Sequence, residues 1–292
     1  MISMLEHESL PRWKDYLLIF YFAMSFPVLR YFLDIFIFQK LARQCIFPHG
    51  ERLMKKSMQE AGLKKLPKFT ESAWKLTYYA VAETLLLLCT AREPWFGKTK
   101  YFWINWPYHM LKLKMKLLYT GQCGFYVYSV AALLVWETRR KDFGVMMTHH
   151  IITIFLITYS YADGLTRAGA ATLLLHDISD IFMESAKLFK YSRNELGASI
   201  SFSLFVVSWF VLRLIIFPLW IIWSISVEAI DYIDMNKRSD FTQYYIMNTL
   251  LIMLLILHIY WWLLIWRMLM KLLQNWGKVG DDVRSDSEDE NS

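Results

Sequence analysis

Long apolar runs dominate this chain, and they constrain its fold more than any other feature. A helix of about 20 apolar residues spans the hydrocarbon core of a bilayer. Several runs approach or exceed that length, for example residues 17–38 and 243–270. A soluble domain of 292 residues would show more polar interruptions than this chain, which is 56% hydrophobic. The sequence therefore predicts an all-α, polytopic helical bundle in a membrane.

About seven membrane-spanning helices are predicted from these runs, and six spans with one run lying in the interface remain an alternative. The second and fifth spans are the weakest of the set. The segment 92–116 carries five Lys among several Trp and Tyr, which indicates an interfacial stretch rather than a free loop. The predicted spans are roughly 17–38, 75–91, 117–136, 143–162, 167–187, 198–226 and 243–270.

The distribution of basic residues predicts which side of the membrane each loop faces. Cytoplasmic loops carry an excess of Lys and Arg. With the N-terminus in the lumen, the cytoplasmic segments hold 19 Lys and Arg and the lumenal segments hold 11. The N-terminus is therefore predicted to be lumenal and the C-terminus cytoplasmic. The cytoplasmic segments are then 40–75, 138–142, 187–197 and the end from 267.

Two polar segments lie outside the spans. RLMKKSMQEAGLKKLPKF, residues 52–69, suits either an amphipathic helix on the membrane surface or a solvated helix. The final DDVRSDSEDENS is acidic and is predicted to be disordered, with Ser285 and Ser287 as candidate phosphorylation sites.

The net charge of +6 does not indicate binding to nucleic acid, because no basic motif with stacking aromatics lies on a soluble segment.

Five ionisable side chains interrupt the fourth and fifth predicted spans. Such a group costs about 2.5–3.5 kcal/mol at the centre of a bilayer on insertion scales, so it suggests a functional site. The fourth span contributes two adjacent histidines and the fifth contributes the sequence HDISD. The five residues are His149, His150, His176, Asp177 and Asp180.

A short turn brings these two groups to the same depth. Asp163 and Gly164 favour a turn within residues 162–167, so the two spans form an antiparallel hairpin. Residues equidistant from the turn then lie level with one another. His149 and Asp180 satisfy this condition and are predicted to lie roughly 9–10 Å inside the cytoplasmic end.

Three interpretations of this cluster remain open from the residues alone. It could be a polar network that joins two helices. It could hold a zinc ion through two His and an Asp, although the adjacent His149 and His150 point about 100° apart on a helix and chelate poorly. The third interpretation is acid–base or nucleophilic chemistry, in which a carboxylate orients an imidazole. We expect no metal and no cofactor.

One long block of sequence is specific enough to suggest a family. RRKDFGVMMTHHIITIFLITYSYADGLTRAGAATLLLHDISDIFMESAKLFKY, residues 139–191, closely resembles the longevity-assurance motif of ceramide synthases, which carry a TLC domain. NWP, GFYVYS, RLIIFPLW and LHIYWW also fit that family. The chain length, the absence of a homeobox-like insert and the sequence of the first span resemble the plant branch.

The resemblance implies an activity and an organisation of the chain. It implies acyl transfer from a fatty acyl-CoA to the amine of a sphingoid base, sphinganine or phytosphingosine, in the endoplasmic reticulum membrane. Membrane lipids are further expected partners, and a homodimer or heterodimer stays open. The predicted parts are 1–40 with the first span, a basic linker 41–69, a TLC catalytic domain 70–275 and an acidic tail 276–292. The alternative is a non-enzymatic TLC-type protein that binds or transports lipid.

The resemblance also implies roles for the clustered residues. His149 and His150 would be essential, and one of them would carry the acyl group. The hairpin geometry favours His149, with Asp180 orienting it, and His150 is the alternative. Asp177 and His176 would complete the network.

Substrate contacts are predicted less directly. Arg139, Arg140 and Lys141 could meet the CoA phosphates at the cytoplasmic mouth. His258 and Arg213, in the seventh and sixth spans, are further candidates for substrate binding, although a bundle histidine with satisfied hydrogen bonds explains His258 as well. In the first span, Arg30 and Asp34 are four residues apart and are predicted to neutralise one another.

Overall fold

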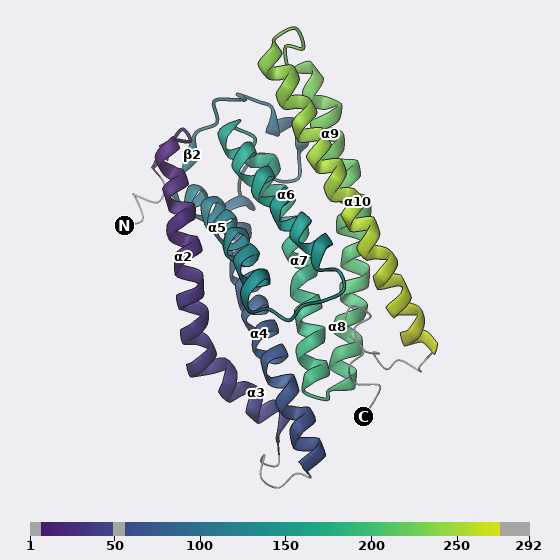
Figure 1. Ribbon diagram of the computed structural model, residues 1–292. Coiled ribbons are helices and arrows are strands. Elements are labelled where there is room, and N and C mark those ends of the chain that lie inside the picture. Colours follow the sequence, from purple (N-terminus) through teal and green to yellow (C-terminus); the bar gives the residue numbers. More distant parts are fainter. Residues whose placement is uncertain (1–6, 49–55, 275–292) are drawn as a thin grey trace.

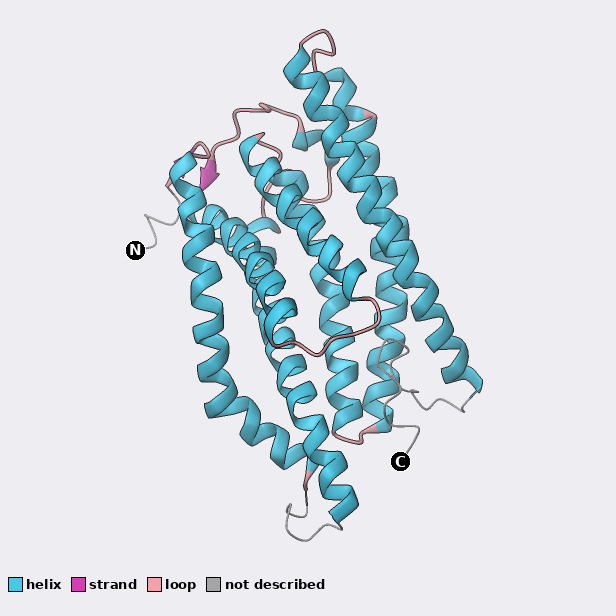
Figure 2. Ribbon diagram, viewed as in Figure 1, coloured by secondary structure: helices cyan, strands magenta, loops and turns pink. Residues whose placement is uncertain are grey.

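The computed structural model describes residues 7–48 and 56–274 of the chain. The candidate phosphorylation sites Ser285 and Ser287 lie outside the described residues. Helices run side by side along one axis, and a two-residue strand pair near the N-terminus is the small exception (Figures 1 and 2). The elements are β1 (Glu8–Ser9), η1 (Trp13–Asp15), α2 (Tyr16–Leu33), η2 (Asp34–Phe38), α3 (Gln39–Ile46), α4 (Lys56–Thr90), η4 (Thr99–Phe102), β2 (Leu111–Lys112), α5 (Leu113–Val135), α6 (Phe143–Ala162), α7 (Thr166–Tyr191), α8 (Glu195–Ser208), η5 (Trp209–Ile222), α9 (Trp223–Ser226), η6 (Glu228–Asp231) and α10 (Arg238–Gln274).

The predicted all-α membrane bundle is confirmed, whereas the number of spans stays a prediction. Within the described residues, five helical segments are long and apolar enough to cross a membrane. The helices α4 and α7 do not meet that criterion, because acidic and basic side chains interrupt their apolar runs. They correspond to the two weakest predicted spans. The five segments are Trp13–Ile46, Leu113–Val135, Phe143–Ala162, Glu195–Asp231 and Arg238–Gln274.

The helix α7 is central to the packing. It packs against α4, α8, α6 and η5, while α2 lies along α5 and α10 lies against η5 and α6. A helix surrounded in this way can direct polar side chains toward protein rather than toward lipid. The polar sequence of α7 is therefore compatible with a place inside the bundle.

The basic stretch before the second predicted span does not form a separate surface helix where it is described. From Lys56 onward it belongs to α4, which continues without a break to Thr90. A helix of 35 residues is about 52 Å long at 1.5 Å per residue, which exceeds the roughly 30 Å of a hydrocarbon core. The first turns of α4 therefore extend beyond the apolar layer, consistent with their basic character.

A proline lies in the longer of the two widened helical segments that the described residues contain. Pro218 lies inside η5, a π-helical stretch between α8 and α9. A proline lacks the backbone N–H and its ring clashes with the carbonyl of the preceding turn, and a local widening of the helix relieves both effects. The same segment carries Arg213, and it packs against α7.

The segment predicted to be interfacial, between α4 and α5, folds against one end of the bundle (Figure 1). Trp103 Nε1 donates a hydrogen bond of 3.0 Å to Ser224 Oγ on α9. Trp106 Nε1 donates one of 2.8 Å to the backbone oxygen of Asp163, in the turn between α6 and α7. The indole groups thus tie the segment to the turn and to α9.

The predicted turn between the fourth and fifth spans is confirmed at Gly164. This residue has a φ of +73°. Residues that carry a Cβ atom rarely adopt such a backbone angle, whereas glycine adopts it readily. A Cβ atom here would also clash with the backbone carbonyl of Pro107. Its carbonyl oxygen lies 2.9 Å from Nδ1 of His109, which is 1% exposed. Glycine is therefore required both by the turn and by the close approach of the neighbouring segment.

Asp163, in the same turn, is expected to make stability depend on pH. Burial first, and the nearby charge of Asp240 second, raise the pKa of Asp163 to about 7 from its usual 3.8, while a hydrogen bond from Gln243 opposes the shift. A carboxyl with a raised pKa holds its proton more tightly in the folded state. Its contribution is fully present below pH 3.8 and is lost as the pH rises through 7.

The measurement is the thermal unfolding midpoint of detergent-solubilised protein between pH 4 and pH 8. Asp163→Asn should remain more stable than the native chain at pH 8, and the difference should shrink toward pH 4. The exposed Asp231 provides the matched control, because Asp231→Asn should follow the native profile. A pH-independent difference between Asp163→Asn and the native chain would contradict the prediction.

Candidate active site

The two histidines of α6 occupy different environments. His149 lines a cavity between the helices of the bundle. His150 is 8% exposed, and its ring centroid lies 5.6 Å from that of Tyr126 on α5. His150 is not among the residues that line the cavity. The helical offset of about 100° between neighbours explains why only one of the two imidazoles reaches it.

The cavity lies between α5, α6, α7, η5, α9 and α10, and its empty volume is about 570 Å³ when the space open to the outside is included. His149 and His176 lie at the same end of it, because they are far along α6 and α7 from the turn that joins these helices. Most of its wall is aliphatic, so the cavity suits an apolar chain better than a polar ligand. The lining residues include Leu156, Ile157, Leu173, Leu251 and Leu254.

Two aromatic side chains that sequence reasoning did not assign enclose His149. The ring centroid of Trp261 lies 5.3 Å from that of His149, and the centroid of Tyr126 lies 6.3 Å from it. Trp261 Nε1 donates a 3.0 Å hydrogen bond to Asp142, the residue before α6. This bond links α10 to the start of α6. Both aromatic residues belong to stretches that resemble the family, GFYVYS and LHIYWW. Neither residue by itself indicates a place beside His149.

His176 and His258 form a hydrogen-bonded pair. His176 Nδ1 lies 2.6 Å from the backbone oxygen of Thr172, and its Nε2 lies 3.0 Å from Nε2 of His258. Because a carbonyl can only accept, Nδ1 of His176 must carry a proton. In a neutral ring, Nε2 of His176 then accepts, and His258 must be the donor. The pair thus assigns opposite tautomers to two rings that are 5% and 0% exposed.

Arg213 is the principal partner of Asp180. Its Nη2 lies 2.9 Å from Asp180 Oδ2 and donates a 2.7 Å hydrogen bond to the backbone oxygen of His176. Its Nε donates one of 2.8 Å to Ser179 Oγ, and its guanidinium lies 4.0 Å from the ring centroid of Trp209. No contact with His149 is shown for Asp180. The role of Asp180 in orienting that imidazole therefore stays a prediction.

Asp177 faces a different group of residues. Its Oδ2 accepts a 2.7 Å hydrogen bond from Gln122 Nε2, and the amide oxygen of Gln122 accepts one of 2.5 Å from the hydroxyl of Tyr78. Asp177 is fully buried and does not line the cavity. It therefore links α7 to α4 and α5, while His149 lies on the cavity side of α7.

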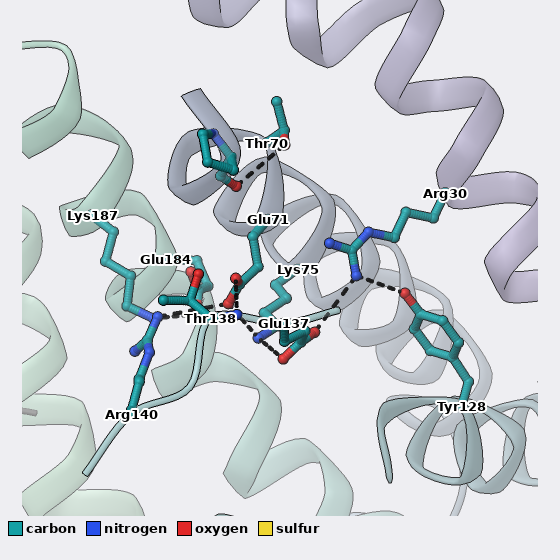
Figure 3. A network of polar contacts seen from close by, with 11 residues as sticks. Arg30, Thr70, Glu71, Lys75, Tyr128, Glu137, Thr138, Arg140, Glu184 and Lys187 are labelled. Carbon is teal, nitrogen blue, oxygen red and sulfur yellow. Dashed lines mark hydrogen bonds and ion pairs between the residues drawn. The ribbon is translucent and has the colours of Figure 1, made fainter. Parts of the chain in front are cut away.

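A network of ion pairs holds the segment between α5 and α6 in place (Figure 3). Lys75 on α4 pairs with Glu71 at 3.0 Å and with Glu137 at 2.8 Å. Arg30 on α2 lies 3.6 Å from Glu137 and donates a 3.0 Å hydrogen bond to the hydroxyl of Tyr128. The predicted pairing of Arg30 with Asp34 is wrong, because Asp34 accepts a hydrogen bond from Gln39 instead.

The residues predicted to contact substrate divide into two groups. In the first group, Arg140 lies 3.7 Å from Glu71 within the same network. Arg139 and Lys141 are exposed, and the guanidinium of Arg139 lies 4.4 Å from the ring centroid of Phe143. Arg213 and His258 are buried between α7, η5 and α10, and neither lines the cavity.

Across residues 7–48 and 56–274, no three His, Cys, Asp or Glu side chains are arranged to share one metal ion. The imidazoles at the cavity contact other side chains and the backbone instead.

The sequence and its relatives fit one family. The profile of the TLC domain family matches residues 68–267. Ceramide synthase LOH2 of Arabidopsis thaliana is 52% identical over 270 residues, which are 92% of this chain and 90% of that protein. Ceramide synthase 1 LOH3 of the same plant is 50% identical and covers 98% of this chain and 94% of its own length. Ceramide synthase 4 of Mus musculus is 36% identical over 77% of this chain and 56% of its own length.

Proposed function

This chain belongs to the ceramide synthases of the TLC-domain family, and we propose that His149 is the nucleophile of its reaction. The reaction transfers a fatty acyl group from acyl-CoA to the amine of a sphingoid base. The plant relatives cover nearly the whole chain at about half identity. The proposal concerns how the buried site of α6 and α7 performs that transfer.

One observation carries the assignment: His149 lines the cavity, and its neighbour His150 does not. A nucleophile must reach the carbonyl carbon of its substrate. The aliphatic wall beyond His149 suits the hydrocarbon part of a fatty acyl group. An acyl group placed with its chain in the cavity has its thioester at the imidazole of His149 and its CoA outside.

In the first step, the unprotonated ring nitrogen of His149 attacks the thioester carbon. The C–N bond forms, the C–S bond breaks, and the proton of the other ring nitrogen leaves with the thiolate as CoA–SH. Trp261 and Tyr126 surround the ring and exclude water from the acyl-imidazole. Exclusion of water matters because hydrolysis would release a free fatty acid.

In the second step, the neutral amine of the sphingoid base attacks the acyl carbon. The amide C–N bond forms, the bond to His149 breaks, and one amine proton returns to the imidazole. The ring of His150, with its centroid 5.5 Å from that of His149, is the proposed relay for this proton. Asp180 acts indirectly, because Arg213 connects it to the backbone of His176.

The CoA moiety is proposed to approach from the cytoplasmic side of the endoplasmic reticulum membrane. The segment 136–142 lies next to the start of α6 and presents the exposed Arg139 and Lys141. Their charges complement the phosphates of CoA. Arg140 contributes to the position of this segment through Glu71.

Purified full-length protein tests this function. With acyl-CoA and sphinganine or phytosphingosine, it should form ceramide and release one free CoA for each ceramide. Lipid mass spectrometry and a thiol assay measure the two products. Binding of both lipids without any release of CoA would instead indicate a lipid-binding protein and overturn the proposal.

A further inference from the structure

A second, smaller cavity lies beyond the end of the first that is remote from His149. It lies beneath the segment between α4 and α5 and the turn before α10, and its empty volume is about 250 Å³ when the space open to the outside is included. Aromatic side chains form much of its wall, with Asp163 and Gln243 as polar members. The aromatic side chains are Trp103, Trp106 and Tyr244.

Three apolar side chains line both cavities. They are Leu165 from the turn before α7, Ile225 from α9 and Met247 from α10. Their exposed fractions are 4%, 3% and 5%. Because the same side chains face both spaces, they form a partition one side chain thick between the two cavities. We call these three residues the partition.

The position of the partition defines a length. His176, beside His149 in the cavity, and Leu165 are 11 positions apart in the sequence of α7 and its preceding turn. At about 1.5 Å per residue this separation is roughly 16 Å. A fully extended chain advances about 1.2 Å per bond, so the first cavity accommodates on the order of 14 bonds.

We propose that the partition of Leu165, Ile225 and Met247 sets the longest acyl chain that this enzyme accepts. The inference rests on the proposed function, with the acyl carbonyl at His149. A chain of about 16 carbons fills the first cavity and ends at the partition. A much longer chain can enter only if these side chains are displaced, because protein interiors are close-packed and leave little free volume.

Met247 is the most informative position of the three. Leu165 follows Gly164, whose backbone is held against Pro107, so a change there risks the turn itself. Met247 lies within α10, and its shortening to alanine opens the partition toward the aromatic cavity without altering the backbone. The same helix carries Met253, which is 41% exposed and provides a matched control.

The test is a competition between C12, C16 and C24 acyl-CoA at equal concentration with one sphingoid base. Full-length protein in membranes is used, and ceramides are measured by mass spectrometry. The native chain should form mainly C16 ceramide. Met247→Ala should raise the ratio of C24 to C16 ceramide on the order of tenfold, since burial of even two further methylene groups changes a binding constant by about that factor. Met253→Ala should keep the native ratio.

A second variant tests the opposite direction. Leu251 lines the first cavity one turn closer to His258 than Met247 does, so Leu251→Phe should shift the products from C16 toward C12 ceramide. If Met247→Ala does not fold, the ratio of C12 to C16 ceramide in Leu251→Phe tests the proposal by itself.

Two outcomes overturn the proposal: abundant C24 ceramide from the native chain, or an unchanged profile of acyl-chain lengths in both folded variants. A native chain that forms no ceramide of any length would instead contradict the proposed function.

Discussion

Replacement of His149 by alanine is expected to abolish acyl transfer, with kcat/KM lowered at least about a thousandfold. The imidazole lines the cavity in which the acyl chain is placed, and alanine offers no nucleophile there. In the native protein, acyl-CoA without a sphingoid base should add one acyl mass to the chain and release CoA. Intact-protein mass spectrometry and a thiol assay check both results, which His149→Ala should lose together.

His150→Ala separates the roles of the two histidines. If His150 relays a proton, this variant should still gain the acyl mass and release CoA, but should transfer the acyl group to the amine more slowly. Loss of the adduct in His150→Ala, together with its retention in His149→Ala, would move the nucleophile to His150. Ceramide formation at the native rate without any adduct would favour direct transfer between the two bound substrates.

Replacement of Arg213 by methionine is expected to destabilise the fold by about 3–5 kcal/mol. Arg213 is 3% exposed and is the ion-pair partner of Asp180. Its loss removes the ion-pair partner of the Asp180 carboxylate, whose side chain is 14% exposed, and removes the hydrogen bonds to Ser179 and to the backbone of His176. The thermal or denaturant midpoint of solubilised protein measures the change. The exposed Arg139 is the matched control, and Arg139→Met should stay within about 0.5 kcal/mol of the native stability.

A double replacement distinguishes electrostatics from packing. Arg213→Met with Asp180→Leu removes both charges, and should recover much of the stability lost in the single variant, because well-packed apolar side chains often substitute for a buried ion pair. Activity should not recover, since the link from Asp180 to the backbone of His176 is gone. A double variant as unstable as Arg213→Met alone would show that the ion pair is not the origin of the loss.

The hairpin that carries the histidines and HDISD could be predicted because it follows from local features. Apolar runs, a short turn at Asp163 and Gly164, and the fixed rise of a helix place His149 level with HDISD. The structure confirms the turn and the antiparallel helices α6 and α7. Helical periodicity likewise separates the directions of His149 and His150.

The partners of the charged residues could not be predicted in the same way. Arg30 and Asp34 satisfy the spacing of a helical ion pair, yet Arg30 contacts Tyr128 and Glu137, and Asp34 contacts Gln39. Spacing along one helix indicates which residues can meet on its surface. It does not indicate which charged or polar partners a neighbouring helix places nearby.

The sequence by itself determined the membrane bundle, its family and the hairpin that carries the ionisable cluster, because each depends on composition or on contacts close in the chain. Only the tertiary structure decided that His149 reaches the cavity, that Asp180 pairs with Arg213, and that Leu165 and Met247 meet at its far end. These relationships join helices distant in sequence. They depend on the rotation of each helix about its axis, which is set by the packing of the whole bundle.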